Sequence, residues 1–309
     1  MDIGDEQPQS AGMAAAMRDA AIGDLDWSIL PHGVTAGTFD APSGALATIS
    51  TGTAGNPCVL LVPGATGSKE DFVLMMPVLV AAGFHVLSFD LAGQYESAAA
   101  GPENLVPPRR RYDYELFVAD FLAVMESLRQ PCHVVGYSFA GTVAQLAYAR
   151  RPELFRSLTL LSCPPLAGQC FRGVSRIGPF TGLATPRVGA ALMIWGIKRN
   201  IITVPPGRLR FVQERLLVTR RQSVRDIMGL MMKTPDLRRL LAGVALPKLV
   251  AVGEHDLWPS RLHADFAAAI GAKLSIYASG HSPGETSPYQ LCEDLLALFA
   301  GADGPAPEI

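Results

Sequence analysis

A serine between small residues is the first candidate for chemistry in this sequence, at position 138 of the stretch HVVGYSFAG (residues 133–141). The aliphatic run before it predicts a buried strand and the residues after it predict a helix, so Ser138 would lie on a tight strand-to-helix turn. Such a turn presses the residues two before and two after the serine together, and Gly136 and Ala140 are both small. Helix N-termini also stabilise negative charge. The pattern predicts a nucleophilic serine, and an ordinary serine in a glycine-containing turn is the alternative.

A base and an acid must accompany such a serine, because a hydroxyl attacks only when a base takes its proton and an acid orients that base. His281 lies in a loop after the last expected strand and is the best candidate for the base. Asp256 also follows a strand, about one strand-helix-strand unit earlier, and we expect it to orient His281, with Glu254 in reserve. The remaining histidines are expected to be structural or solvent-facing: His32, His85, His133, His255 and His263.

The elements that would position these residues alternate between strand and helix patterns. Short aliphatic runs bounded by Gly, Pro or Asp alternate with helical periodicity, which is typical of βαβ units on a parallel sheet. The expected strands are 45–50, 58–62, 85–89, 133–137, 158–162, 248–252 and 273–277. The expected helices are 69–81, 112–128, 139–149, 260–270 and 288–300.

A basic middle segment, residues 166–245, interrupts this alternation. Its apolar positions recur at helical spacing and predict three or four amphipathic helices inserted between two strands of one sheet. The segment holds 14 Lys and Arg against three acidic residues, a net charge of +11, whereas the rest of the chain carries −13. We therefore expect a separate structural layer on an acidic body.

Composition excludes several classes of protein. With 309 residues, 49% of them hydrophobic and 17% charged, the chain can bury a large core and is not disordered or fibrous. Five cysteines without a C-x-x-C pair argue against a disulfide framework or a metal site. No glycine-rich nucleotide motif follows a strand, so no cofactor is expected. Residues 72–89 are nearly uncharged, but Pro77 and Gly83 divide them into helix and strand, so no membrane span is expected. The acidic N-terminus argues against secretion, which predicts a cytoplasmic protein.

The chain order Ser138, Asp256, His281 resembles that of the α/β-hydrolase fold family, and Pro63-Gly64 after a strand resembles its oxyanion loop. The resemblance covers roughly residues 34–301. It implies an α/β core at 34–165 and 246–301 and an inserted helical cap at 166–245, which leaves an N-terminal extension at 1–33, expected to be partly disordered, and a tail at 302–309. It also implies that the backbone N–H groups of Ala65 and Phe139 form an oxyanion hole.

This resemblance implies a serine hydrolase that cleaves an ester, thioester or lactone of a small to medium apolar acyl substrate. Non-hydrolytic chemistry such as acyl transfer, cyclisation or C–C cleavage, in the secondary metabolism of a bacterium, and a binding protein with an idle triad are the alternatives. The basic cap is typical either of a solvated surface that balances the acidic body or of a site that attracts an anionic substrate or an acyl carrier, and no nucleic acid is expected. The residues expected at the substrate pocket are Gly64, Ser68, Gln94, Tyr137, Met193, Trp195, Phe211 and Met231.

Overall fold

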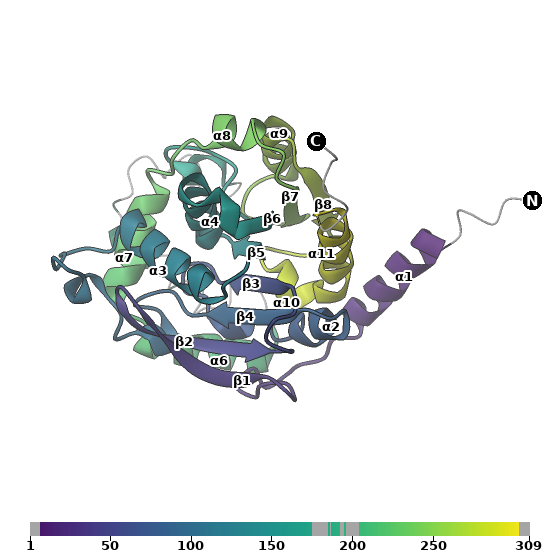
Figure 1. Cartoon of the computed structure of the whole chain (residues 1–309), viewed down its shortest axis with the longest axis horizontal. Coiled ribbons are helices and arrows are strands. Elements are labelled where there is room, and N and C mark those ends of the chain that lie inside the picture. The colour runs from purple at the N-terminus through teal and green to yellow at the C-terminus, as the bar shows by residue number, and fades with distance from the viewer. Residues whose placement is uncertain (1–6, 175–184, 186, 192–194, 196–203, 303–309) are drawn as a thin grey trace, which may run out of the picture.

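An eight-stranded sheet forms the centre of the computed structural model, which describes residues 7–174, 185, 187–191, 195 and 204–302 (Figure 1). Its strands follow the order β1-β2-β4-β3-β5-β6-β7-β8. The two pairs that involve β2 are antiparallel, and all other neighbours in this sheet are parallel. The strands are β1 (Thr35–Ala41), β2 (Gly44–Thr51), β3 (Cys58–Val62), β4 (His85–Phe89), β5 (Cys132–Tyr137), β6 (Phe155–Leu161), β7 (Lys248–Gly253) and β8 (Lys273–Tyr277).

Helices cover both faces of the sheet because its central strands are apolar on both sides. Adjacent residues of β5 show this: Val134 belongs to the hydrophobic cluster on one face and Val135 to the cluster on the other. The first face is covered by α3 (Tyr114–Ser127), α4 (Phe139–Arg150) and α9 (Ser260–Ile270). The opposite face is covered by α2 (Met76–Ala81) and α11 (Pro288–Ala302). The structure is the α/β-hydrolase fold that the sequence predicted.

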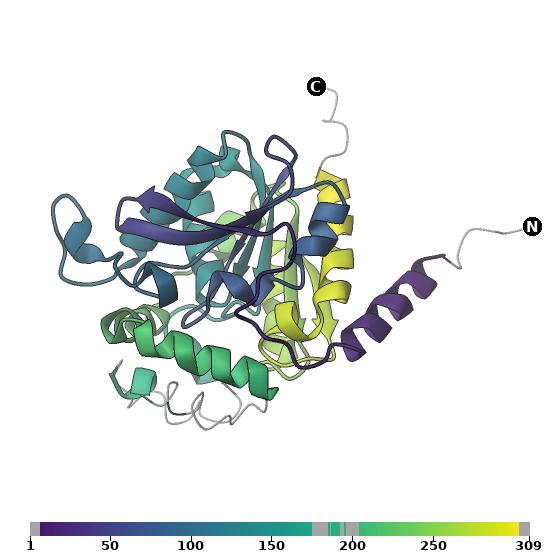
Figure 2. The same cartoon turned by 90° about the horizontal axis from the view of Figure 1, so that it is seen from below.

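Among the described residues, the insertion between β6 and β7 includes the helices α6 (Pro206–Val218), α7 (Arg221–Met231) and α8 (Arg238–Ala242). Figure 2 shows α6 and α7 together on one side of the molecule. They lie near the segment after β4, because Arg220 N donates to Gly93 O and Ser223 Oγ donates to Ala92 O. The inserted helices therefore contact the edge of the sheet where the parallel strands end.

The N-terminal extension contains a helix, α1 (Gln7–Ala20), that no sequence pattern indicated. Asp19 near its end accepts hydrogen bonds from the backbone N–H groups of Tyr289 and Gln290, which lie in the first turn of α11. Arg18 lies 3.7 Å from the centre of the Tyr289 ring. These contacts fasten α1 to the body through the free N–H groups of another helix.

Two other parts of the sequence prediction differ from the structure. The helix expected over residues 69–81 is broken into a 3-10 turn, η1 (Lys69–Phe72), and α2. The antiparallel strand β1 and the short helix α10 (Pro283–Thr286) were not expected. Their formation depends on partners elsewhere in the fold, which a local hydrophobic pattern does not reveal.

Candidate active site

Ser138 stands on the turn between β5 and α4, with φ 52° and ψ −117°. Few residues with a side chain adopt these angles, so the turn is strained. Its backbone N–H donates to Leu161 O at the end of β6, over 2.8 Å, which fixes the turn to the sheet. The serine is 7% exposed. The strained backbone thus places Ser138 at the corner between the strand and the helix, where its side chain keeps a small exposed surface.

Close packing explains the small residues around this turn. A Cβ on Gly136 would lie 2.8 Å from the carbonyl oxygen of Ala140, and a Cβ on Gly141 would lie 2.7 Å from Sγ of Cys163. Both distances are too short for a real side chain. The glycines let the helix turn back sharply over the strand, as the sequence predicted for Gly136.

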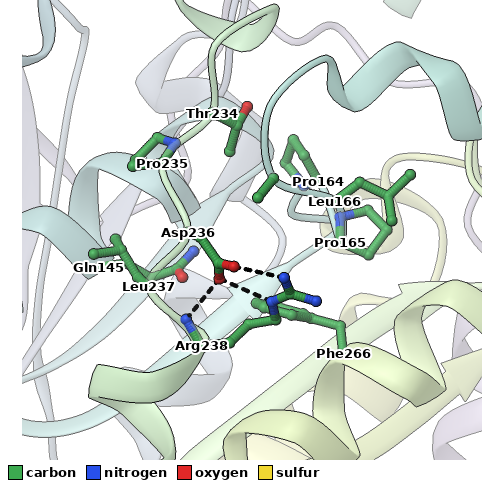
Figure 3. Close-up of a pocket in the computed structure, with 11 residues that line it drawn as sticks. Gln145, Pro164, Pro165, Leu166, Thr234, Pro235, Asp236, Leu237, Arg238 and Phe266 are labelled. Atoms are coloured by element: carbon green, nitrogen blue, oxygen red, sulfur yellow. Dashed lines mark hydrogen bonds and ion pairs between the residues drawn. The ribbon is translucent and has the colours of Figure 1, made fainter.

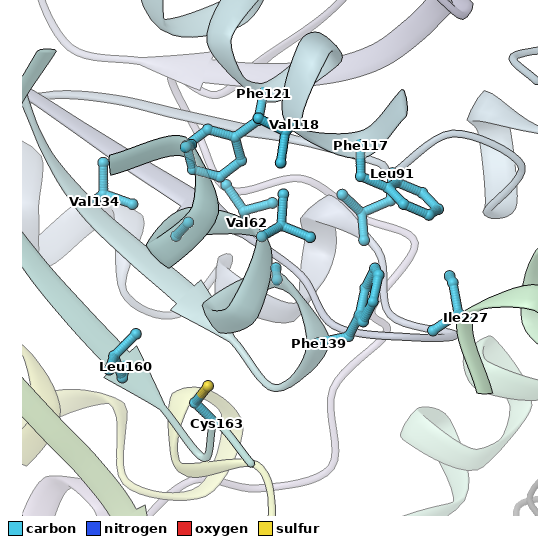
Figure 4. Packing of buried hydrophobic residues seen from close by; sticks show 14 of the residues in the cluster. Val62, Leu91, Phe117, Val118, Phe121, Val134, Phe139, Leu160, Cys163 and Ile227 are labelled. Carbon is cyan, nitrogen blue, oxygen red and sulfur yellow. The ribbon is translucent and has the colours of Figure 1, made fainter. Parts of the chain in front are cut away.

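Phe139, the residue after the serine, anchors the start of α4 in the core (Figure 4). Its ring is fully buried, edge-on to Phe117 at 5.2 Å and stacked on Tyr114 at 5.7 Å. Ile227 of α7 belongs to the same cluster. The packing therefore connects the turn that carries Ser138 to an inserted helix.

His281 lies within reach of both Ser138 and Asp256. Its Nε2 is 3.3 Å from Oγ of Ser138, and its Nδ1 is 2.7 Å from Oδ1 of Asp256. The two loops that carry histidine and aspartate pack directly on each other, because Gly253 has no room for a Cβ against the backbone of Gly280. The reserve candidate Glu254 is exposed.

The aromatic rings of Tyr137 and Trp258 flank His281, with centroids 5.4 and 6.0 Å from the imidazole. The hydroxyl of Tyr137 is 2.9 Å from Oγ of Ser282, in the histidine loop. The Asp256 side chain is fully buried. Burial alone would raise its pKa, but the charge of His281 and the close contacts with His281 and His263 lower the pKa well below the usual range. This carboxyl group is therefore ionised, as a group that stabilises an imidazolium must be.

The loop after β3 runs directly beside Ser138. A Cβ on Gly64 would lie 2.8 Å from the Cβ of Ser138. Among the described residues, the backbone N–H groups of Ala65 and Phe139 donate no hydrogen bond, and Phe139 is the first residue of its helix. Two free donors next to a nucleophile are what an oxyanion site requires.

Gln94 connects this loop to the inserted helix α7. Its Oε1 accepts from the N–H of Thr66 over 2.9 Å, and its Nε2 donates to Oγ of Ser223 over 2.6 Å. Gln94 is completely buried. It therefore holds the loop in place, a role more specific than the pocket position that the sequence suggested.

Two arginines of α6 form a buried ion network with the body. Arg208 contacts Asp71 and Glu285, and Arg215 contacts Asp71, each over 2.6 Å, while Arg215 also donates to Ser68 Oγ over 3.1 Å. Although burial raises the pKa of Asp71, the two guanidinium groups lower it. The network joins α6 to the segment after the Gly64 loop and to the segment after His281.

The other residues expected at the pocket have different surroundings. Phe211 is buried and edge-on to Tyr95 at 5.7 Å, and Met231 is buried in the core cluster that contains Phe139. Trp195 is 53% exposed, and its place at the pocket stays a prediction. Met193 lies outside the described residues.

Sequence reasoning missed three contributors to this site: His263, Arg208 and Arg215. His263 was expected to be structural or solvent-facing, yet its Nε2 lies 3.4 Å from Oδ2 of Asp256. The two arginines appeared only as part of the basic segment. Their spacing of seven residues, which places both on one face of a helix, was the available signal.

Two cavities of the described residues lie apart from the candidate site, because neither is lined by Ser138, Asp256 or His281. One measures about 10 Å³ and lies between the segments 164–167 and 234–238 (Figure 3). It is too small for more than one water molecule. The other, about 410 Å³, is an open depression on the outer side of α6.

Within the described residues there is no group of His, Cys, Asp and Glu that could hold a metal ion. None of the helices there has the length and apolarity to cross a membrane.

Comparison with known proteins identifies the family. A profile of the Alpha/beta hydrolase family matches residues 59–295, so the chain belongs to the alpha/beta hydrolase family. A probable esterase of Oryza sativa subsp. japonica is 32% identical over 110 residues, which are 35% of this chain and only 38% of that protein. A hydrolase from Pseudomonas aeruginosa PA01 superimposes with a TM-score of 0.68 at 21% identity, over 85% of this chain and 98% of that one. A malate-bound thermophilic esterase from Thermogutta terrifontis gives 0.66 at 18% identity, over 87% and 99%. These two structures share the fold.

Proposed function

We propose that this protein is a serine hydrolase that cleaves an ester or thioester through a covalent acyl-enzyme, with Ser138 as nucleophile, His281 as general base and Asp256 as the group that orients the base. The observation that carries the proposal is the unbroken relay of contacts, 3.3 Å from Ser138 Oγ to His281 Nε2 and 2.7 Å from His281 Nδ1 to Asp256 Oδ1. The contact between His281 and Asp256 is a normal hydrogen bond that orients the imidazole. The contact between Ser138 and His281 lies just beyond the range of about 2.6 to 3.2 Å for proton transfer, as is common in free enzymes.

In the first half of the reaction, Oγ of Ser138 attacks the substrate carbonyl carbon while Nε2 of His281 takes the hydroxyl proton. The carbonyl oxygen becomes negatively charged and accepts hydrogen bonds from the N–H groups of Ala65 and Phe139. One such donor commonly accounts for a 10²- to 10³-fold effect on kcat, which is roughly 3 to 4 kcal/mol. His281 then gives its proton to the departing alcohol or thiol, and the acyl group remains on Ser138. In the second half, His281 takes a proton from water, the hydroxide attacks the acyl carbon, and the proton returns to Ser138 as the acid leaves.

For the substrate, we propose a small to medium apolar acyl group held under a cap formed by residues 166–245. Apolar residues support this: Phe211 and Met231 of α6 and α7 are buried on the side of the inserted helices that meets the body. The positive charge of the cap is a weaker argument for an anionic substrate or acyl carrier. Arg208 and Arg215 are neutralised by Asp71 and Glu285, so they add little net field at the entrance.

The test is the hydrolysis of p-nitrophenyl acetate and butyrate by the wild type, by Ser138→Ala and by Ser162→Ala. Ser162 is a matched control, because it is also a buried serine at positive φ (44°) at the end of a parallel strand. We expect Ser138→Ala to lose the burst of p-nitrophenol and all turnover above background, and Ser162→Ala to keep both. Undiminished turnover in Ser138→Ala contradicts the proposal. A burst without continued turnover would instead favour an acceptor other than water.

A further inference from the structure

The carboxylate of Asp256 faces two histidines, not one. Its Oδ1 contacts His281 Nδ1 at 2.7 Å and also accepts the N–H of Leu257, while its Oδ2 lies 3.4 Å from Nε2 of His263. His263 belongs to the first turns of α9, seven residues after Asp256. The second histidine thus lies on the side of the carboxylate away from His281.

The two facing atoms, Oδ2 of Asp256 and Nε2 of His263, are buried and have no other partner in the part of the chain that the structure describes. The side chains of His263 and Asp256 have no exposed surface. Among the described residues, neither Oδ2 of Asp256 nor either ring nitrogen of His263 makes a hydrogen bond of good geometry. A buried carboxylate oxygen and a buried N–H that are both unpaired are costly, and at a separation of 3.4 Å a small turn of the His263 ring that points its N–H at the oxygen pairs them with each other. Catalytic hydrogen bonds are often long in the free enzyme and shorten when substrate binds.

Trp258 keeps the two histidines in this arrangement. Its ring is edge-on to His263 at 6.2 Å and tilted against His281 at 6.0 Å. Its Nε1 donates to Cys170 O over 2.7 Å, which fixes the ring. The fixed ring of Trp258 therefore packs against both histidines that face Asp256.

We propose that His263 is a positioning residue for the reaction proposed above, on which this inference rests. In its neutral form with the proton on Nε2, His263 donates to Oδ2 of Asp256 and fixes the plane of the carboxylate. Oδ1 then stays aligned with Nδ1–H of His281, and His281 stays aligned with Ser138. Without this donor the carboxylate can rotate about its Cβ–Cγ bond, and the base loses its orientation in the transition state.

The test compares His263→Gln with His263→Met. The two replacements have similar length and volume, but only glutamine carries an N–H donor at the end of its side chain. His255→Gln is the control, because His255 is exposed and adjacent to Asp256 in the sequence. For p-nitrophenyl butyrate we expect His263→Met to lose about 10- to 100-fold in kcat, as is usual when a residue that orients a functional side chain is removed. KM should change by no more than about twofold, and His263→Gln should recover most of kcat.

Several outcomes would overturn the inference. Equal losses in the glutamine and methionine variants would mean that His263 only fills space. Full activity in His263→Met would mean that Asp256 needs no second donor. If neither variant folds, the ¹⁵N resonances of the wild-type histidine rings decide, because a proton on Nδ1 of His263 and none on Nε2 contradicts the inference. Failure of the proposed function is distinguishable: in that case the wild type itself forms no acyl-enzyme at Ser138.

Discussion

Replacement of Gly64 by alanine should disable the enzyme without unfolding it. An ideal Cβ at this position lies 2.8 Å from Cβ of Ser138 and 3.1 Å from the carbonyl oxygen of Tyr137. Ordinary contact begins at 3.4 Å, so the loop and the serine must separate by about 0.6 Å. Gly64 is not at a positive φ, so the substitution introduces no backbone strain of its own. The whole effect therefore comes from the displacement of the oxyanion loop relative to the nucleophile.

A displacement of this size typically costs on the order of 10²-fold in rate, because attack and charge stabilisation both depend on sub-ångström geometry. The measurement is kcat/KM for p-nitrophenyl butyrate, with urea denaturation to verify folding. Gly280→Ala is a demanding control: this glycine precedes His281, yet a Cβ there meets nothing within 4 Å. We expect Gly280→Ala to stay within about threefold of the wild type. A folded Gly64→Ala variant with wild-type kcat/KM would refute the assignment of this loop to the oxyanion site.

Three further outcomes concern stability and can all be measured by urea denaturation. Ser138→Gly should be about 1 to 2 kcal/mol more stable than Ser138→Ala, because glycine relieves the strain at φ 52°. Arg208→Ala should destabilise the protein by about 3 to 5 kcal/mol, since it leaves the mostly buried carboxylate of Glu285 without its ion-pair partner and removes one of the two partners of Asp71. Arg220→Ala, which breaks a partly exposed pair, should cost at most about 1 kcal/mol. Burial raises the pKa of Asp120 to about 6 despite hydrogen bonds from Ser43, so the folded state binds more protons than the unfolded state between about pH 4 and 6. The unfolding free energy of the wild type should therefore decrease as the pH rises from about 4 to 6, relative to that of Asp120→Asn. Equal stabilities for the two Ser138 variants, equal costs for the two arginine variants, or parallel pH curves would contradict the respective arguments.

The sequence predicted the fold and the three residues of the relay because their signals are local. Ser138 lies between an aliphatic strand and a helix with small residues at fixed offsets, and Asp256 and His281 each follow a strand directly. Parallel strands place such residues at one edge of the sheet whatever the details of packing. Short local motifs were therefore sufficient to predict that Ser138 and His281, which lie 143 positions apart, come close together.

The features that the sequence did not reveal depend on contacts between distant segments. Asp19 meets the start of α11 across 270 positions, and Arg208 meets Asp71 across 137. Periodicity shows that a helix has an apolar face, but not which charged residue on it will find a buried partner. His263 is close to Asp256 in sequence, yet only the turn into α9 directs its ring to the carboxylate.

Labelling with a fluorophosphonate tests the central claim most directly, because this reagent reacts with a serine only when a base activates it and an oxyanion site stabilises the adduct. The wild type should gain the mass of one phosphonyl group, and peptide mass spectrometry should locate it on Ser138. Ser138→Ala should remain unlabelled, and His281→Ala should react far more slowly. An adduct on another residue, or hydrolysis of p-nitrophenyl butyrate by a wild type that takes up no label, would contradict the account.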